Sequence, residues 1–213
     1  MTSKKQTTKN KILETTIELL NEKGISNVTM RDVSQKLDIS VGNLTYHYPK
    51  WELLIDDIFI RFQADIEEMY KVYPYDISEV VAYINKIYAI QIKYTFLFSN
   101  FYIFFRLYPK YKEIKDAFFH QRMIALREAL QRLEEKDFLY PADKKHNYDL
   151  LVKNTWLVLS SWYGFSVMFS GSSYAFTKEE FFLSMWNLYV HHLTLKGKNA
   201  VRRSYVDIKK RSL

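Results

Sequence analysis

Residues 30–48 read MRDVSQKLDISVGNLTYHY, and they carry the most specific structural signal in the sequence. It fits a helix-turn-helix, in which two short helices meet at a steep angle and need a small residue where they touch. Ser34 supplies the small residue, and Asp38 occupies the turn, where a residue must tolerate left-handed backbone geometry. The apolar residues that would pin the inner faces of the two helices are Val33, Leu37, Ile39 and Leu44. Two ordinary short helices would show the same apolar spacing, but not the small residue, the turn and the caps together.

Helix signals flank this motif on its N-terminal side and within it. Apolar residues at helical spacing predict a helix over about 8–23, and Gly24 is placed to cap its C-terminus in the left-handed conformation. Thr29 and Ser40 are good N-caps for the two helices of the motif. The second helix of the motif must end before Pro49. The sequence therefore predicts a compact three-helix unit over residues 1–48.

The rest of the chain favours further helices. Only 5 Gly and 4 Pro occur among 213 residues, so turns are few and uninterrupted segments are long. Apolar residues in these segments recur at helical spacing, and no convincing strand pattern appears. We expect an all-α fold of about nine helices. The last two of these helices are expected over about 144–170 and 178–196.

The charge of the chain is concentrated at its two ends. The net charge is +7, with 8 basic and 5 acidic residues in 1–50, and 7 basic and 1 acidic residue in 196–213. Basic ends favour a polyanionic partner, either nucleic acid or a membrane surface. A frayed and solvated terminus would explain the tail 196–213 equally well. The absence of cysteine excludes a disulfide scaffold and a thiolate metal site, and it fits the cytoplasm that we expect.

One uncharged stretch, 154–177, is long enough to span a bilayer. Its apolar part, 156–169, is too short by itself, and several serines and two glycines interrupt the stretch. We therefore expect a buried helix and no membrane contact. Two alternatives stay open: a membrane-associated helical protein, and a helical carrier or enzyme with a chance helix-turn-helix-like segment.

Catalytic and metal-binding signals are weak. His191 and His192 adjoin on an expected helix, so their side chains point in different directions and cannot easily share a metal ion. No Gly-rich phosphate loop is present, and no Ser-His-Asp or paired-carboxylate arrangement can be singled out. We expect neither catalysis nor a bound metal or cofactor.

The motif and its surroundings resemble the TetR family of bacterial transcriptional regulators. The family pattern after the turn is a short helix with Gly, Leu, aromatic residues and His, followed by Lys, an acidic residue and Leu. The matching residues are Gly42, Leu44, Tyr46, His47, Tyr48, Lys50, Glu52 and Leu54. The resemblance covers about residues 10–58. The chain departs from the pattern at Thr45, where the family usually has Tyr, and at Trp51, where it usually has Lys.

The resemblance implies a ligand-responsive regulator, most often a repressor, that binds a palindromic operator in double-stranded DNA as a homodimer. Residues 1–48 would form the DNA-binding domain, and residues 49–213 the ligand-binding and dimerisation domain. The implied DNA-binding residues are Thr29, Arg31, Val41, Gly42, Asn43, Thr45, Tyr46, His47, Tyr48 and Lys50. Asn43 would suit adenine and Lys50 a phosphate. Alternatively, Asn43 completes the cap at Ser40, and Tyr48 belongs to the core.

The resemblance also implies a ligand cavity and a dimer interface in the C-terminal helices. Aromatic residues make up 17% of the chain, which favours an apolar or aromatic small-molecule effector. The expected ligand-binding residues are Phe62, Phe101, Tyr102, Phe105, Arg106, Trp156 and Phe165, with Arg106 or Tyr102 as the polar element. Arg106 would equally pair with a structural carboxylate. The expected interface residues, on the last two helices, are Ser160, Ser161, Gly164, Trp186 and Tyr189.

Overall fold

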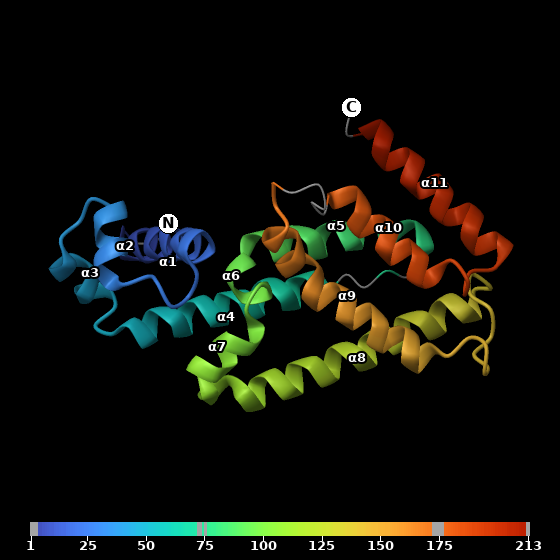
Figure 1. The fold of residues 1–213 in the computed structure, drawn as a ribbon, viewed down its shortest axis with the longest axis horizontal. Coiled ribbons are helices and arrows are strands. Elements are labelled where there is room, and N and C mark those ends of the chain that lie inside the picture. Colours follow the sequence, from blue (N-terminus) through green and yellow to red (C-terminus); the bar gives the residue numbers. More distant parts are fainter. Residues whose placement is uncertain (1–3, 72–73, 75, 172–176, 212–213) are drawn as a thin grey trace.

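A computed structural model describes residues 4–71, 74, 76–171 and 177–211, and the described chain is built from α-helices (Figure 1). The helices are α1 (Lys4–Lys23), α2 (Met30–Lys36), α3 (Val41–His47), α4 (Trp51–Tyr70), α5 (Ile77–Lys93), α6 (Thr95–Phe98), α7 (Phe101–Leu107), α8 (Lys112–Glu135), α9 (Tyr148–Met168), α10 (Lys178–Tyr189) and α11 (Leu195–Arg211). A short 3-10 helix, η1 (Pro109–Tyr111), leads into α8. Within these residues the sole β-type pairing is an isolated bridge between Leu139 and Leu193. The predicted all-α class is confirmed.

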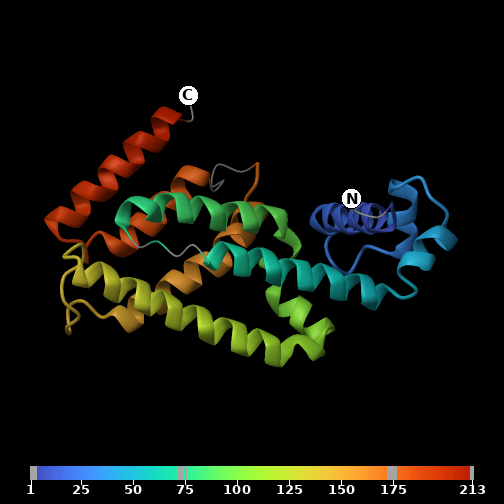
Figure 2. The ribbon, with the colours of Figure 1, turned by 180° about the vertical axis from the view of Figure 1, so that it is seen from behind.

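The three N-terminal helices form one end of the molecule, and the other helices extend away from them (Figure 1 and Figure 2). Helix α4 leads from this end toward the middle, where it packs against α5. Helix α9 packs against α6, α8 and α10. Helix α11 lies at the far end and packs against α5. The helix-turn-helix is therefore presented at one tip of an elongated helical body.

The predicted caps and turns of the N-terminal helices are confirmed. Thr29 caps α2 in a reciprocal capping box, in which the Asp32 carboxylate accepts from the Thr29 backbone amide. The side chain of Ser40 accepts a hydrogen bond from an amide in the first turn of α3. Gly24 ends α1 with a φ of +79°, and Asp38 in the turn has a φ of +54°. These local signals fix the ends of the short helices before any packing acts on them.

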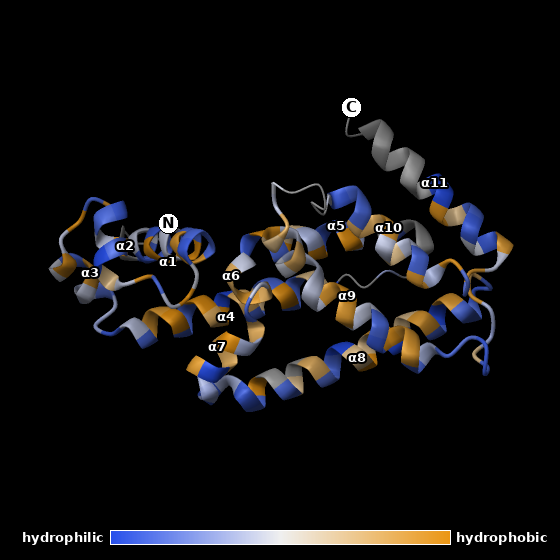
Figure 3. Cartoon of the chain, in the orientation of Figure 1, coloured by the Kyte–Doolittle hydropathy of each residue, from blue (hydrophilic) through white to orange (hydrophobic). Residues whose placement is uncertain are grey.

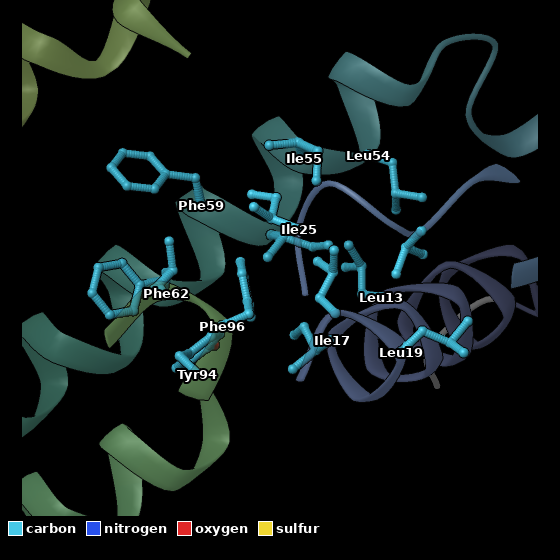
Figure 4. Packing of buried hydrophobic residues seen from close by; sticks show 14 of the residues in the cluster. Leu13, Ile17, Leu19, Ile25, Leu54, Ile55, Phe59, Phe62, Tyr94 and Phe96 are labelled. Carbon is cyan, nitrogen blue, oxygen red and sulfur yellow. The ribbon is translucent and has the colours of Figure 1, made fainter. Parts of the chain in front are cut away.

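A single hydrophobic cluster joins the three N-terminal helices to the helices that follow (Figure 4). In Figure 4 the apolar side chains of α4 face those of α1 on one side and those around α6 on the other. Buried members of the cluster include Ile12, Leu13, Ile17, Leu20, Val33, Leu44, Leu54, Ile55, Ile58, Phe59, Phe62, Tyr94, Phe96, Phe104 and Tyr111. The core of the N-terminal unit therefore continues across residue 48 into α4, α6, α7 and η1.

The expected count of about nine helices is too low, because one expected helix is divided and one was not foreseen. The aromatic segment before Pro109 forms two helices, α6 and α7, instead of one. The break falls at Asn100, whose φ of −145° and ψ of 39° lie outside the helical region. Asn favours such local breaks because its side chain competes for backbone hydrogen bonds. Aromatic residues on both sides of the break hide it in the apolar pattern.

The expected last helix, about 178–196, is also wrong at its C-terminal end. Helix α10 ends at Tyr189, and the chain then pairs Leu193 with Leu139 in the isolated bridge. The side chain of Thr194 accepts a hydrogen bond from the amide of Gly197 and starts a new helix, α11. Residues 196–211 of the basic tail are therefore helical and mostly hydrophilic where described (Figure 3). Side chains from residue 204 onward lie outside what the structure describes.

Gly197 lies inside α11, where the sequence suggests a helix stop. A Cβ atom at this position would lie 2.2 Å from the carbonyl oxygen of Phe138. Only glycine lets the first turn of α11 approach the backbone of the α8–α9 connection this closely. The glycine therefore permits close contact between α11 and the α8–α9 connection, which the sequence alone does not reveal.

The uncharged stretch 154–177 contributes the second part of α9, and its residues 172–176 lie outside the described residues. Helix α9 is buried on one side only, which corrects the expectation of a buried helix. Thr155 and Trp162 are buried, whereas Leu157 and Met168 are 62% and 64% exposed. Across the described residues, no helix combines the length and apolar character needed to cross a membrane.

We predict that Gly197→Ala lowers the free energy of unfolding by about 2 kcal/mol, because the added methyl group overpacks the contact with Phe138. Asn199→Ala is the matched control, since Asn199 is exposed on the same helix. Urea unfolding followed by circular dichroism measures both changes. Equal stability of the two variants would show that α11 does not depend on this close approach.

Candidate functional site

The helix-turn-helix is held together by a small buried contact. Ser34 is 2% exposed where α2 meets α3, and its hydroxyl donates to the carbonyl oxygen of Arg31. Val33 and Leu44 are fully buried on the facing sides of the two helices. The amide of Ile39 donates to the carbonyl oxygen of Ser34 and closes the turn. The small residue and the apolar pins thus have the positions that the sequence predicts.

The structure gathers most of the expected DNA-binding residues on the outer surface of α3 and the adjoining ends of α2 and α4. Seven are exposed: Thr29, Arg31, Val41, Gly42, Asn43, Tyr46 and Lys50. Thr45 and His47 are half-buried, and Tyr48 is buried. Tyr46 is the most prominent, with 70% of its surface exposed. Leu44, on the opposite side of α3, faces the core as expected.

Hydrogen bonds fix the first turn of α3. The backbone amide of Asn43 donates to Ser40 Oγ at 3.0 Å, while the Asn43 residue is exposed. The hydroxyl of Thr45 donates to the carbonyl oxygen of Gly42 at 3.1 Å. Asn43 therefore completes the cap through its backbone, which leaves the role of its side chain as a prediction.

Gly42 has no structural reason to be glycine within the described protein. A Cβ atom there would meet its nearest neighbour, Ser40 Oγ, at 3.8 Å, which is an ordinary van der Waals distance. Glycine is less favourable than alanine in a helix, by up to about 1 kcal/mol in a helix interior, and Gly42 lies in the first turn of α3. The protein does not recover that cost through its own packing, so the missing side chain points to a close approach by another molecule.

Tyr48 anchors the end of α3 to α4. It is 2% exposed, and its hydroxyl donates to the Asp57 carboxylate at 2.9 Å. The ammonium group of Lys9 lies 4.8 Å from the centre of the Tyr48 ring and 3.6 Å from Asp57. Burial, together with the nearby carboxylate, holds the pKa of Tyr48 well above its ordinary value. The structure thus places Tyr48 in the core, in agreement with the alternative that the sequence left open.

Lys50 occupies the N-cap position of α4 and is exposed. The amides at the start of a helix, together with a lysine, favour a phosphate group. Its neighbour Trp51 is half-buried, and the indole N–H donates to the Tyr108 hydroxyl at 3.1 Å. The cation is therefore the exposed member of this pair, and the tryptophan connects α4 to the α7–η1 region.

Asp56, on the same turn of α4 as Asp57, contacts a different part of the protein. Its carboxylate lies 2.5 Å from the Lys110 ammonium group and accepts a hydrogen bond from the Tyr111 hydroxyl. Burial would raise the pKa of Asp56, but these two donors outweigh it and hold the pKa below its ordinary value. Adjacent aspartates thus connect α4 to α1 and α3 and to η1.

A second candidate site lies between α4, α5, α6, α7, α8 and α9. It consists of a partly enclosed cavity of about 40 Å³ and an adjoining, more open groove of about 550 Å³. The residues that line both parts are Phe98, Phe101, Phe119, Trp156 and Ser160. The Phe119 and Trp156 rings are 5.1 Å apart in an edge-to-face arrangement. Aromatic side chains thus line the cavity and the groove where the two adjoin.

Six of the seven expected ligand-binding residues line this site. Phe62 lines the cavity, Phe101 and Trp156 line both parts, and Tyr102, Phe105 and Phe165 are on the groove. Arg106 lines neither part, and its guanidinium lies 5.9 Å from the Tyr102 ring on the surface.

Sequence analysis missed Gln91, which lines the cavity and is 0% exposed. A signal for Gln91 existed, because a glutamine stands among apolar residues at helical spacing in α5. The sequence alone does not say whether such a residue meets a neighbouring helix or a cavity. The structure shows that this polar side chain borders the partly enclosed cavity.

The expected dimer residues have mixed positions. Gly164 faces α6 within the same chain, where a Cβ atom would lie 3.4 Å from Ser99 Cα. Tyr189 is half-buried with its hydroxyl 2.8 Å from that of Thr155, and Trp186 packs against a core cluster. Ser160 and Ser161 line the cavity and the groove. The exposed apolar residues on α9 and α10 are instead Leu150, Leu157, Phe165, Val167, Met168 and Leu183.

His192 contacts a histidine from another part of the chain. Its Nδ1 atom is 3.3 Å from Nδ1 of His146, which precedes α9 and is 8% exposed. Burial and the two nearby histidines, His146 and His191, lower the pKa of His192. The described residues contain no group of three or more metal-ligating side chains. The pair contributes to the contact between the α8–α9 and α10–α11 connections.

Comparison with known proteins matches both parts of the chain to one family. Residues 12–58 match the family described as "Bacterial regulatory proteins, tetR family", and residues 61–201 match TetR, described as "Bacterial transcriptional repressor". A crystal structure of a TetR-family transcriptional regulator from Marinobacter aquaeolei VT8 is similar, with a TM-score of 0.81 and 20% sequence identity. The match covers 93% of this chain and 97% of that chain, and it shows a shared fold. No curated protein matches significantly.

We predict that Tyr48→Phe lowers the free energy of unfolding by about 1 kcal/mol, because Asp57 loses a partly buried hydrogen-bond donor. Tyr46→Phe is the matched control, since Tyr46 is 70% exposed on the same helix and its substitution should change stability little. Thermal or urea unfolding distinguishes the two variants. A loss of the same size in both variants would contradict the anchoring role of Tyr48.

Proposed function

Because the chain belongs to the TetR family of bacterial transcriptional regulators, we propose that it is a ligand-responsive repressor that binds a palindromic operator as a homodimer. In this proposal residues 1–48 form the DNA-binding domain, and residues 49–213 form the ligand-binding and dimerisation domain. Helix α3 enters the major groove of the operator. The partner is double-stranded DNA, and no bound cofactor is required.

The observation that carries the DNA contact is the unexplained glycine on an exposed helix. Gly42 is less favourable in a helix than alanine, and no neighbour in the described protein requires the missing side chain. It lies between the exposed residues Val41 and Asn43. A bare backbone at this position lets the start of α3 approach base edges. Asn43 and Thr45 are then placed to read bases, and Lys50 to contact a phosphate.

The short length of α3, the helix proposed to contact bases, supports a dimer. Helix α3 has 7 residues, and a helix this short reads too few base pairs for useful specificity by itself. A two-fold dimer places two copies of α3 on successive major grooves, about 34–36 Å apart. The exposed apolar side chains of α9 and α10 offer the surface for such an interface.

The response to a ligand would pass through α4. Helix α7 lines the groove through Phe101 and Phe105, and the residues just after α7 hold α4 through Tyr108 and Lys110. A ligand that shifts α7 would therefore shift the start of α4 and the anchored end of α3. Binding of the ligand and of the operator would be coupled reciprocally, so each would weaken the other by the same factor.

A gel shift on DNA from the region upstream of the chain's own gene tests the DNA contact. We predict that Lys50→Ala weakens binding to all sequences and reduces the slope of log affinity against log salt by about one unit. Asn43→Ala should instead relax the preference at one base position, because it removes a reader of a base edge. Lys86→Ala, an exposed lysine on α5, is the control and should bind normally. Wild-type affinity and base preference in both α3–α4 variants would overturn the assignment.

We predict that Leu157→Glu separates the dimer, because a charge would replace an apolar side chain that is 62% exposed on α9. Ile124→Glu is the control, since Ile124 is 46% exposed on α8, away from the proposed interface. Light scattering at micromolar protein concentration measures the molar mass of each variant. A wild-type monomer that still binds its operator, or a Leu157→Glu dimer, would contradict the proposed interface.

A further inference from the structure

Three fully buried hydroxyl groups are satisfied within their own helices, whereas several other buried side-chain atoms of the described chain have no hydrogen-bond partner, and Gln91 Oε1 is the one of these that lines the cavity. Thr16, Ser34 and Thr155 each donate a hydroxyl group to a carbonyl oxygen three or four residues earlier on their own helix. Gln91 is 0% exposed and donates its side-chain amide to the carbonyl oxygen of Leu159 on α9. Its own carbonyl oxygen, Oε1, accepts no hydrogen bond from the described residues.

The orientation of the Gln91 amide is fixed by chemistry. The main-chain oxygen of Leu159 can only accept a hydrogen bond, so the NH₂ end of Gln91 must face it. The Oε1 atom is therefore the end that is left over. A buried acceptor without a donor is rare in folded proteins and calls for a specific explanation. Gln91 borders the partly enclosed cavity, which supplies that explanation if a donor enters there.

No charged group accompanies Gln91 in the described lining of the site. Cavity and groove are lined by aromatic and aliphatic side chains, Gln91, serines, one glycine and two tyrosines. Burial raises the pKa of one of these, Tyr70, to about 12, so it is neutral at physiological pH. Arg106, the expected partner for an acidic ligand, lines neither part. The guanidinium of Arg122 lies 4.0 Å from the centre of the Tyr70 ring but is not itself a lining residue. A charged ligand would therefore lose its hydration without gaining a counter-charge among the lining side chains.

The two volumes determine how a ligand would lie. The partly enclosed cavity, about 40 Å³, is much smaller than the roughly 150 Å³ cavity that holds a benzene molecule in another protein. The groove, about 550 Å³, falls within the usual range for small-molecule sites. A ring therefore fits in the groove, between Phe101, Phe105 and Trp156, while only a small polar edge reaches Gln91.

We propose that this site binds a neutral aromatic molecule carrying an N–H or O–H group, which donates a hydrogen bond to Gln91 Oε1. The inference rests on the proposed function in one respect, because it assigns the chemistry of the effector for the same groove. Gln91 selects for the donor, and the aromatic walls supply contact area. A molecule of the same shape without a donor leaves Oε1 desolvated and unpaired, and it binds less well.

The test compares indole, which has an N–H donor, with benzofuran, which has the same shape and none. Binding is measured by ligand-observed NMR and calorimetry on the full chain without DNA. We expect indole to bind wild-type protein about tenfold more tightly than benzofuran. In Gln91→Leu the preference should disappear, and Gln131→Leu, an exposed glutamine on α8, should retain it. Indole-5-carboxylate should bind at least about tenfold more weakly than indole.

Several outcomes would overturn the inference. They are equal affinities of wild-type protein for indole and benzofuran, no binding of either at millimolar concentration, a preference that survives in Gln91→Leu, or tighter binding of the carboxylate. Should Gln91→Leu fail to fold, Gln91→Met provides the same loss of the acceptor, and the wild-type comparison still decides. A molar mass that doubles only when the groove is free of indole would show that a second copy of the chain occupies it, and this would also overturn the inference.

The proposed function fails separately. If the gel shift shows operator binding but the donor preference is absent, this inference fails alone. If the Gln91-dependent preference is present but no DNA is bound, the inference holds and the regulator proposal fails.

Discussion

The structure depends on the burial of α4 from two sides. Leu54 points toward the N-terminal helices (Figure 4), whereas the Phe59 ring stacks on Phe104 of α7 and the Phe62 ring contacts Tyr94 beside α6. A helix with a single apolar stripe would dock on one partner and leave the other free to hinge. Here one cluster contains both partners, so displacement of α4 against either one exposes apolar surface. Each Å² of exposed apolar surface costs roughly 25 cal/mol of free energy. The N-terminal unit is consequently positioned by the same packing that forms the body of the protein.

Polar contacts fix the positions of the helices that share this hydrophobic cluster. Asp57 holds Tyr48 at the end of α3, whereas Asp56 holds Lys110 and Tyr111 beside α8. Asn21 adds a third link, because its side chain donates to the Lys93 carbonyl oxygen and accepts from the Phe96 amide. Apolar packing alone tolerates sliding, whereas hydrogen bonds fix register. These contacts therefore connect α6 and η1 to α1 and α4 at defined positions.

The sequence predicted the parts of the fold that are decided locally. Capping side chains, a left-handed turn residue and a small buried serine act within a few residues, so Thr29, Asp38 and Ser34 were identifiable without coordinates. Features decided by distant segments were missed. The close approach of Phe138 makes Gly197 an interior helix residue, although the same glycine reads as a helix end. The helical spacing of α5 points Gln91 toward the core, but only its contact with α9 shows that half of its amide is unpaired.

The same distinction explains why the exposed face of α3 is easier to predict from sequence than the lining of the cavity and groove. Helix α3 has 7 residues, and its buried Leu44 marks the core-facing side. The helical period then shows which of the other residues face away from the core. For a cavity between six helices, the helical period of one segment does not show which residues line it, because a small rotation of one helix exchanges its lining residues. Aromatic residues were abundant enough that six of seven choices line the site, but Arg106 turns away. Gln91 is a further example, because its place at the cavity depends on a hydrogen bond to the Leu159 carbonyl oxygen on α9 and not on its neighbours in sequence.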